Sequence, residues 1–81
     1  MYDKYSKLNS ITIGSKIPTH KGVLLTNTSV TPAGVTMHFY KTTGGTYSGL
    51  VYVAGGFEVL PIEVHTIPQN FPTGVTGFYL T

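Results

Sequence analysis

The 81-residue sequence contains no cysteine and no arginine, and only 10% of its residues are charged. Without cysteine the chain can form no disulfide, and it lacks the commonest zinc ligands. Ordinary globular domains carry about 25% charged residues, so this surface has unusually few groups that interact strongly with water. We therefore expect another protein chain to cover part of it.

The short length limits the chain to one domain with one small core, which buries roughly two-thirds of the surface that the unfolded chain exposes. Small domains are usually reinforced by disulfides, a structural metal or oligomerisation. Disulfides are excluded and the commonest zinc ligands are missing, so oligomerisation is the reinforcement that we expect.

The five basic residues are all lysines, and the formal net charge is only +2. Arginine is the preferred side chain for phosphate and guanine, so its absence argues against a nucleic-acid partner. No stretch approaches the roughly 20 apolar residues of a membrane-spanning helix. The residues after Met1 also lack the apolar region of a signal peptide. We expect a leaderless protein with no membrane partner.

The pattern of apolar residues predicts an all-β fold. They recur with a period of two, and Gly or Pro interrupts nearly every window of a dozen residues. The predicted strands cover residues 10–14, 22–28, 35–42, 46–54, 57–67 and 74–80. About six short strands at this spacing favour a small β-sandwich or a partly open barrel. Residues 1–9 have no periodic pattern and are predicted to form a flexible N-terminal arm before a single β domain, residues 10–81.

Two glycine pairs, Gly44-Gly45 and Gly55-Gly56, can adopt the positive φ angles of tight hairpin turns. They predict a three-strand meander between residues 35 and 67.

Two further positions mark irregularities in these strands. Gly49 predicts a β-bulge. Pro61 cannot donate a ladder hydrogen bond, so its strand must lie at a sheet edge or bend there. The apolar faces of the strands predict a core of Val35, Met37, Phe39, Leu50, Tyr52, Val59, Ile62, Val64 and Phe78.

The side chains that could act in catalysis are few. They are the acids Asp3, Glu58 and Glu63 and the histidines His20, His38 and His65. Glu63 and His65 project from one face of a predicted strand, but a third metal ligand has no visible source. Catalysis also needs an acid or base that is held by a partner group. We therefore expect no enzymatic activity, no metal and no cofactor.

Tyrosines are candidates for contacts between chains, because a tyrosine ring buries a large area while its hydroxyl keeps a polar partner. Stacking of carbohydrate or single-stranded nucleic acid is the alternative use of such rings. Basic residues do not interleave with these tyrosines beyond the arm, which disfavours nucleic acid. The candidate interface residues are Tyr2, Tyr5, Tyr40, Tyr52 and Tyr79.

Five segments between residues 30 and 80 follow a recognisable order. They are Val30-Thr31-Pro32, Gly44-Gly45, Gly55-Gly56, Leu60-Pro61-Ile62-Glu63-Val64 and Thr73-Gly74-Val75-Thr76-Gly77-Phe78-Tyr79-Leu80. A Thr-Pro loop, glycine turns, a Leu-Pro-Ile-x-Val segment and a closing strand in this order resemble the small virion structural proteins of tailed bacteriophages. The resemblance is to spike-base and head-decoration proteins, and it implies a place in a viral particle with no catalytic residues.

We accordingly expect a capsid decoration (cement) subunit or a head-fibre or spike-base subunit. Its partners would be the major capsid protein or another virion protein, and copies of itself in a symmetric oligomer, with a trimer favoured. It would be located in the virion after synthesis in the host cytoplasm. The alternatives are a tail or neck component, a small carbohydrate-binding or receptor-binding β module, and a nucleic-acid-binding barrel.

Overall fold

The computed structural model describes residues 5–81, and within that range the chain forms strands, turns and loops with no helix. The strands are β1 (Leu8–Ser10), β2 (Gly22–Asn27), β3 (Ala33–Tyr40), β4 (Thr46–Val53), β5 (Gly56–Leu60), β6 (Val64–Thr66) and β7 (Val75–Leu80). The all-β prediction is confirmed, and the described residues form one strand more than expected.

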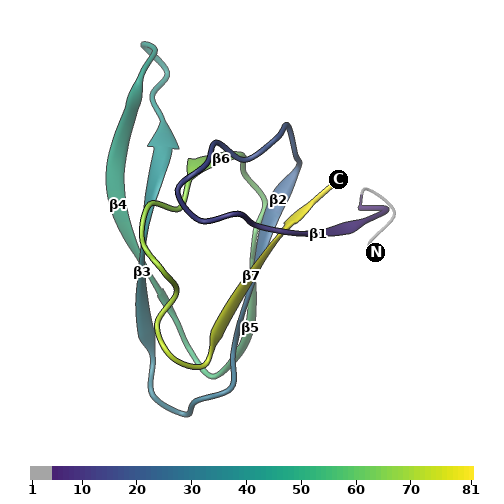
Figure 1. Cartoon of the computed structure of the whole chain (residues 1–81), viewed down its shortest axis with the longest axis vertical. Coiled ribbons are helices and arrows are strands. Elements are labelled where there is room, and N and C mark those ends of the chain that lie inside the picture. Colours follow the sequence, from purple (N-terminus) through teal and green to yellow (C-terminus); the bar gives the residue numbers. More distant parts are fainter. Residues whose placement is uncertain (1–4) are drawn as a thin grey trace.

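The strands form two antiparallel sheets, one in the order β1-β7-β2-β5 and the other in the order β4-β3-β6. Figure 1 shows the two sheets facing each other, with the β3–β4 hairpin extending beyond the rest of the domain. Alternate side chains of each sheet point into the core between them. The buried core residues are Ile17, Val23, Leu25, Val35, Met37, Val53, Val64, Ile67 and Val75. The domain is therefore a small β-sandwich.

The β3–β4 hairpin turns at the predicted glycine pair. Gly44 and Gly45 have φ angles of 97° and 77°. The N–H of Lys41 donates to the carbonyl of Gly45 at 3.0 Å, and the N–H of Gly44 donates to the carbonyl of Lys41 at 3.2 Å. Positive φ is unfavourable for residues with a Cβ atom, so glycine suits both positions.

The predicted bulge at Gly49 is wrong. β3 and β4 pair without interruption from Ala33 opposite Val53 to Tyr40 opposite Thr46. A Cβ atom at Gly49 would lie 2.7 Å from Cε2 of Phe39. The glycine instead lets an aromatic ring of β3 lie against the backbone of β4.

The predicted meander is also wrong, because β5 pairs with β2 in the other sheet and not with β4. The Gly55-Gly56 pair therefore carries the chain from one sheet to the other. Gly56 has a φ angle of 106°. A Cβ atom at Gly55 would lie 2.9 Å from the carbonyl oxygen of Ser29. Gly55 is explained by the close approach of the Ser29 backbone, and Gly56 by the positive φ angle where the chain changes direction.

The strand predicted over residues 57–67 is two strands, β5 and β6, that belong to different sheets. Pro61 lies between them. Because proline has no N–H to donate to a ladder, it ends the pairing of β5 with β2, and the chain then crosses to β3.

The sheet begins two residues before the predicted domain boundary, since β1 starts at Leu8 and pairs with β7. The backbone N–H groups of Ser6 and Lys7 both donate to the carbonyl of Thr81, at 2.6 and 3.1 Å. Of the predicted arm, residues 1–4 lie outside the described range, and the rest runs along the sheet. Of the strand predicted over residues 10–14, β1 includes only the first residue, Ser10.

The predicted core is partly correct. Val35, Met37 and Val64 are buried, Phe39, Val59 and Phe78 are half-buried, and Leu50, Tyr52 and Ile62 are exposed. Ile62 lies between β5 and β6, outside both strands.

In β4 the opposite face points inward. Val51 lies opposite the buried Val35 in the ladder, and Val53 is fully buried. Both faces of this strand are apolar, so a period of two could not identify the buried face. The hairpin register decides it.

Asn27, a buried polar residue at the end of β2, links the two sheets. Its Nδ2 donates to the carbonyl oxygens of Val53 at 2.9 Å and Thr31 at 3.1 Å. Its Oδ1 accepts from the N–H of Ser29 at 2.9 Å. The amide therefore holds the loop after β2 against the end of β4.

Candidate functional site

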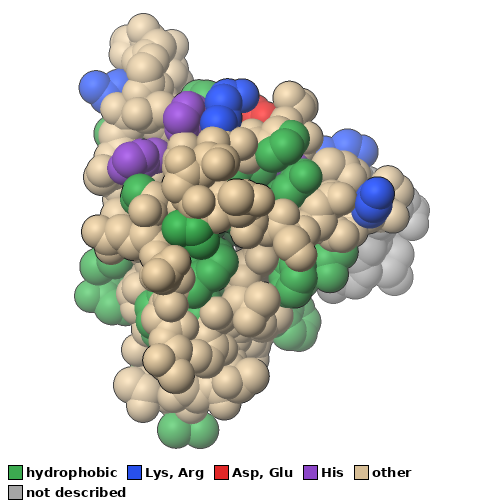
Figure 2. Space-filling model, viewed as in Figure 1, with side chains coloured by type: hydrophobic (Ala, Val, Ile, Leu, Met, Phe, Trp, Pro, Cys, Tyr) green, Lys and Arg blue, Asp and Glu red, His purple; other side chains and the backbone are tan. Residues whose placement is uncertain are grey.

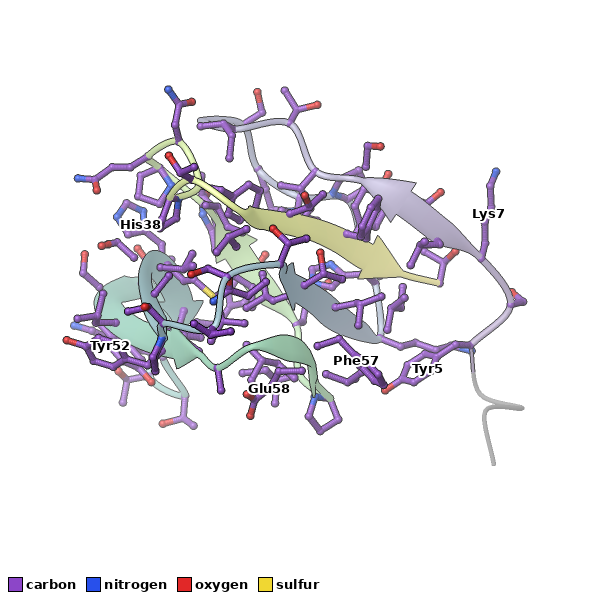
Figure 3. All side chains as sticks on the ribbon, turned by 90° about the horizontal axis from the view of Figure 1, so that it is seen from below. Tyr5, Lys7, His38, Tyr52, Phe57 and Glu58 are labelled. Carbon is purple, nitrogen blue, oxygen red and sulfur yellow. The ribbon has the colours of Figure 1, made fainter. Side chains whose placement is uncertain are left out.

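An apolar groove crosses the outer face of the four-stranded sheet, on the side away from the core. Its volume is about 470 Å³. Figure 3 shows two of its side chains, Tyr5 and Phe57, next to each other. The lining residues are Tyr5, Leu24, Thr26, Phe57, Val59 and Leu80.

Strand alternation places these side chains on one face. In β2, Leu24 and Thr26 alternate with buried neighbours and so point outward. Across the ladder Leu24 faces Val59 and Thr26 faces Phe57. Directly opposite residues of an antiparallel pair lie on the same face, so β2 and β5 together form the floor of the groove.

Tyr5 closes one end of the groove by lying over Gly22 of β2. A Cβ atom at Gly22 would be 3.2 Å from the Tyr5 hydroxyl and 2.9 Å from the carbonyl oxygen of Leu60. The absence of a side chain at this position therefore makes room for the tyrosine.

The chemistry of the groove is almost purely hydrophobic. Its side chains carry two polar atoms, the hydroxyl oxygens of Thr26 and Tyr5. Phe57 is 71% exposed, and Leu8 opposite Leu80 extends the apolar surface onto β1. Exposed apolar surface of this kind is typical of sites that another molecule covers.

A second apolar surface lies on the outer face of the three-stranded sheet. Leu50 and Tyr52 of β4 are 54% and 66% exposed. A Cβ atom at Gly34 would lie 3.1 Å from Cδ1 of Leu50 and 3.3 Å from Cε1 of Tyr52, so both side chains lie over β3. Figure 2 shows hydrophobic side chains on both flanks of the domain, whereas the charged side chains in this view gather in its upper half.

Two of the candidate interface tyrosines lie at these surfaces. Tyr5 lines the groove, and Tyr52 belongs to the second apolar surface. Tyr40, at the end of β3, is 39% exposed, and its ring centroid lies 5.4 Å from that of His65. Tyr2 lies outside the described residues.

Tyr79, the fifth candidate, packs against the core of its own domain. Its ring meets the buried His20 edge-on, with the ring centroids 5.9 Å apart. His20 accepts a hydrogen bond from the N–H of Val64, and its other ring nitrogen lies against the carbonyl of Pro18. Substitution of Tyr79 would therefore affect folding.

Glu63 and His65, which the sequence places on one face, contact different groups. A carboxylate oxygen of Glu63 accepts from the backbone N–H of His20 at 3.4 Å. Nδ1 of His65 lies against the hydroxyl of Thr66. Among residues 5–81, no three side chains of the His, Cys, Asp or Glu type are placed to hold a metal ion together.

Of the six groove residues, sequence reasoning gave a surface role to Tyr5 alone. Leu24, Thr26, Phe57 and Leu80 received no such role, and Val59 was predicted to be in the core. The available signal was in β2, where Leu24 on the outer face and Leu25 on the inner face are both apolar, and on the outer face of β5, which carries Phe57 and Val59. An apolar residue on both faces of an antiparallel sheet indicates that the outer face is covered.

A smaller hollow of about 190 Å³ lies between β1 and Pro18, beside Tyr79. Several of its lining side chains carry hydroxyl groups. Its volume is below the roughly 300 Å³ at which ligand pockets usually begin. The groove is therefore the stronger candidate for a binding surface.

No family model matches the chain, and no curated protein or solved structure is significantly similar to it. The described part of the chain has no helix long and apolar enough to cross a lipid bilayer.

Proposed function

We propose that the chain is a non-enzymatic structural subunit of a tailed-bacteriophage particle. It serves as a capsid decoration (cement) protein or as the base of a head fibre or spike, and it acts as a symmetric oligomer. Its partner is the major capsid protein or another virion protein, and its location is the virion. A tail or neck position is the alternative within the same class.

The groove on the four-stranded sheet is the observation that carries this proposal. Complete burial of a large apolar side chain contributes about 1.5 to 3 kcal/mol of stabilising free energy. Phe57 is mostly exposed in the single chain, so most of this free energy is available for binding a partner. An apolar segment of a neighbouring protein that enters the groove would cover Phe57, Leu24 and Val59 together. The low charge of the whole chain supports the same interpretation, because charged residues are depleted at the centre of interfaces.

The viral setting rests on the resemblance of residues 30–80 to small virion structural proteins. The non-enzymatic role is supported by how the ionisable groups are used. His20 is held by the backbone, and Glu58 and Glu63 are exposed.

The groove gives little support to a carbohydrate-binding module. A carbohydrate site needs several hydrogen-bonding groups around the sugar, because ligand pockets gain their specificity from such polar groups. Thr26 and Tyr5 supply only hydroxyls here, and the remaining lining side chains are hydrocarbon.

Binding to particles tests the proposal. Particles that lack the chain are incubated with the purified wild-type protein, and the bound protein is measured by quantitative mass spectrometry. We expect stoichiometric binding that the Phe57→Lys variant loses, because an ammonium group would have to be buried in an apolar groove.

The matched control is Val30→Lys, which introduces the same ammonium group in place of an apolar side chain at a loop residue that is 96% exposed. This variant should bind like the wild type, and circular dichroism should show all three proteins folded. Absence of the chain from purified virions, together with no binding to particles, would overturn the proposal.

A further inference from the structure

The two sheets have four edges, and three of them are protected against pairing with another chain. β1 and β6 contain three residues each, which gives a partner strand little to pair with. β5 carries Glu58 and is followed by Pro61. Short length, charge and proline are the devices by which natural proteins protect sheet edges.

β4 has none of these devices. It is eight residues long, contains no charged residue and no proline, and pairs with β3 along its whole length. Its residues are mostly β-branched or aromatic, which suits them to a strand. A long and uncharged edge of this kind is a ready template for another strand.

The hairpin closure shows which backbone groups of β4 are free to pair. Lys41 and Gly45 form a hydrogen-bonded pair, because the N–H of Lys41 donates to the carbonyl of Gly45. Bonded and non-bonded pairs alternate along an antiparallel ladder. The even-numbered residues from Thr46 to Tyr52 therefore direct their N–H and C=O groups away from β3.

The side chains of these same residues form the outer face of the edge. Leu50 and Tyr52 are the exposed apolar members, and Ser48 is the small polar one. No charged residue occurs in β4 or in its neighbour β3. A second copy of the strand would therefore meet no like charge, whereas self-pairing of β5 would bring the Glu58 carboxylates near each other.

We infer that β4 pairs antiparallel with β4 of a second copy, around a two-fold axis at Leu50. This inference rests on the proposed role as a symmetric oligomer, and it specifies the contact as two-fold where the sequence favoured a trimer. Leu50 then faces Leu50 of the partner, and Ser48 of each copy faces Tyr52 of the other. All paired residues have even numbers, so the outward backbone groups of both strands bond to each other.

The pairing closes at two copies. Each copy uses the only long unprotected edge among its described strands, and the joined sheet ends in the short strand β6 on both sides. Isologous contacts of this kind give closed dimers and not open filaments. The groove lies on the other sheet, so the dimer leaves it free for a different partner.

Light scattering after size-exclusion chromatography, over a wide range of protein concentration, tests the contact. The wild-type protein should have the mass of two chains. The Leu50→Lys variant should have the mass of one chain while keeping its β-sheet circular dichroism. Val30→Lys, the matched control at an exposed loop residue, should remain a dimer.

A cross-link tests the register independently, because the chain has no cysteine of its own. The α-carbons of a hydrogen-bonded antiparallel pair are about 5.5 Å apart, which lies within the range that a disulfide spans. Mild oxidation of the Leu50→Cys variant should therefore give a covalent dimer, and the Val30→Cys variant should not.

A wild-type protein that is monomeric at every concentration would overturn the β4 contact. An oligomer that survives Leu50→Lys, with no covalent dimer from Leu50→Cys, would also overturn it but would leave the assembly role standing. Particle binding is tested through Phe57 on the opposite sheet. Absence of binding by an intact dimer, together with absence of the chain from purified virions, would therefore overturn the proposed function alone.

Discussion

Nε2 of His20 accepts the hydrogen bond that the backbone N–H of Val64 donates, with a distance of 3.0 Å between the nitrogens. An acceptor nitrogen carries no proton, so the proton of the neutral ring lies on Nδ1, which is 2.7 Å from the carbonyl oxygen of Pro18. The residue is 7% exposed. It joins the segment before β2 to the start of β6, and thereby connects the two sheets.

Replacing His20 with phenylalanine keeps an aromatic ring but removes the acceptor. The N–H of Val64 would then be buried without a partner, which costs about 1 to 3 kcal/mol. Urea unfolding should show a free energy of unfolding lower by that amount. The control is His38→Phe, the same change at a half-buried position on the outer face of β3, which should change the free energy of unfolding much less. Equal losses for both variants would contradict the role of the Val64 hydrogen bond.

Asn27→Asp tests the polar link between the sheets. The change keeps the shape of the side chain but replaces two hydrogen-bond donations with a carboxylate that faces the carbonyls of Val53 and Thr31. We expect the free energy of unfolding at neutral pH to fall by about 2 kcal/mol or more. Asn70→Asp adds the same charge at an exposed position and should have little effect. Similar unfolding curves for the two variants would rule out the link.

Gly77 tests the packing of the interior. A Cβ atom at this position would overlap the ring of Phe71 and approach Cδ2 of Leu25 to 3.2 Å. Gly77→Ala should therefore destabilise the fold by about 1 to 3 kcal/mol through overpacking. The Phe71→Leu change makes room, so the double variant should lose less than the two single losses added together. Additive losses, measured by chemical denaturation, would show that the ring does not restrict this position.

Leu24 and Leu25 are adjacent in β2 but face opposite sides of the sheet. Leu25 is fully buried, so Leu25→Ala should lower the free energy of unfolding by about 2 to 5 kcal/mol. Leu24 lines the groove, so Leu24→Ala should have a smaller effect on unfolding and should weaken particle binding instead. Thermal unfolding and the particle-binding assay separate the two roles. The assignment of faces fails if Leu24→Ala is the more destabilising change.

Much of the fold follows from local sequence rules. The period of two identifies the strands, and the Gly44-Gly45 pair identifies the β3–β4 hairpin, because a turn with two positive φ angles almost requires glycine. Pro61 was correctly placed as an irregularity, since a proline cannot continue a ladder from within.

Strand pairing is where sequence reasoning failed. Gly55-Gly56 has the residues of a hairpin turn, but β5 pairs with β2, and the paired residues are 29 to 37 positions apart in the sequence. Local composition does not encode that choice. The inner face of β4 could not be chosen for the same reason, because Leu50 and Val51 are equally apolar and only the register with Val35 separates them.

The candidate site was predictable only in outline. Low charge and abundant tyrosine indicated an interface, and Tyr5 and Tyr52 do lie on apolar surfaces. The groove itself unites residues from β2, β5, β7 and the segment before β1. These segments meet only through the sheet order, so their combination could not be read from the sequence.

The sheet order also determines when the domain can fold. Among the described strands, β3–β4 is the only pair whose members are consecutive in the sequence. In contrast, β1 pairs with β7 alone, and β7 lies between β1 and β2 in the sheet. Each non-local pair requires the closure of a long loop before its contacts give any stabilisation, so we expect refolding on the slow scale of milliseconds to seconds. Until β7 has been added, β1 has no partner, and β2 has only β5 to pair with. A nascent chain would therefore expose the apolar faces of these strands until Leu80 is in place, and early release or truncation within β7 would favour aggregation over folding.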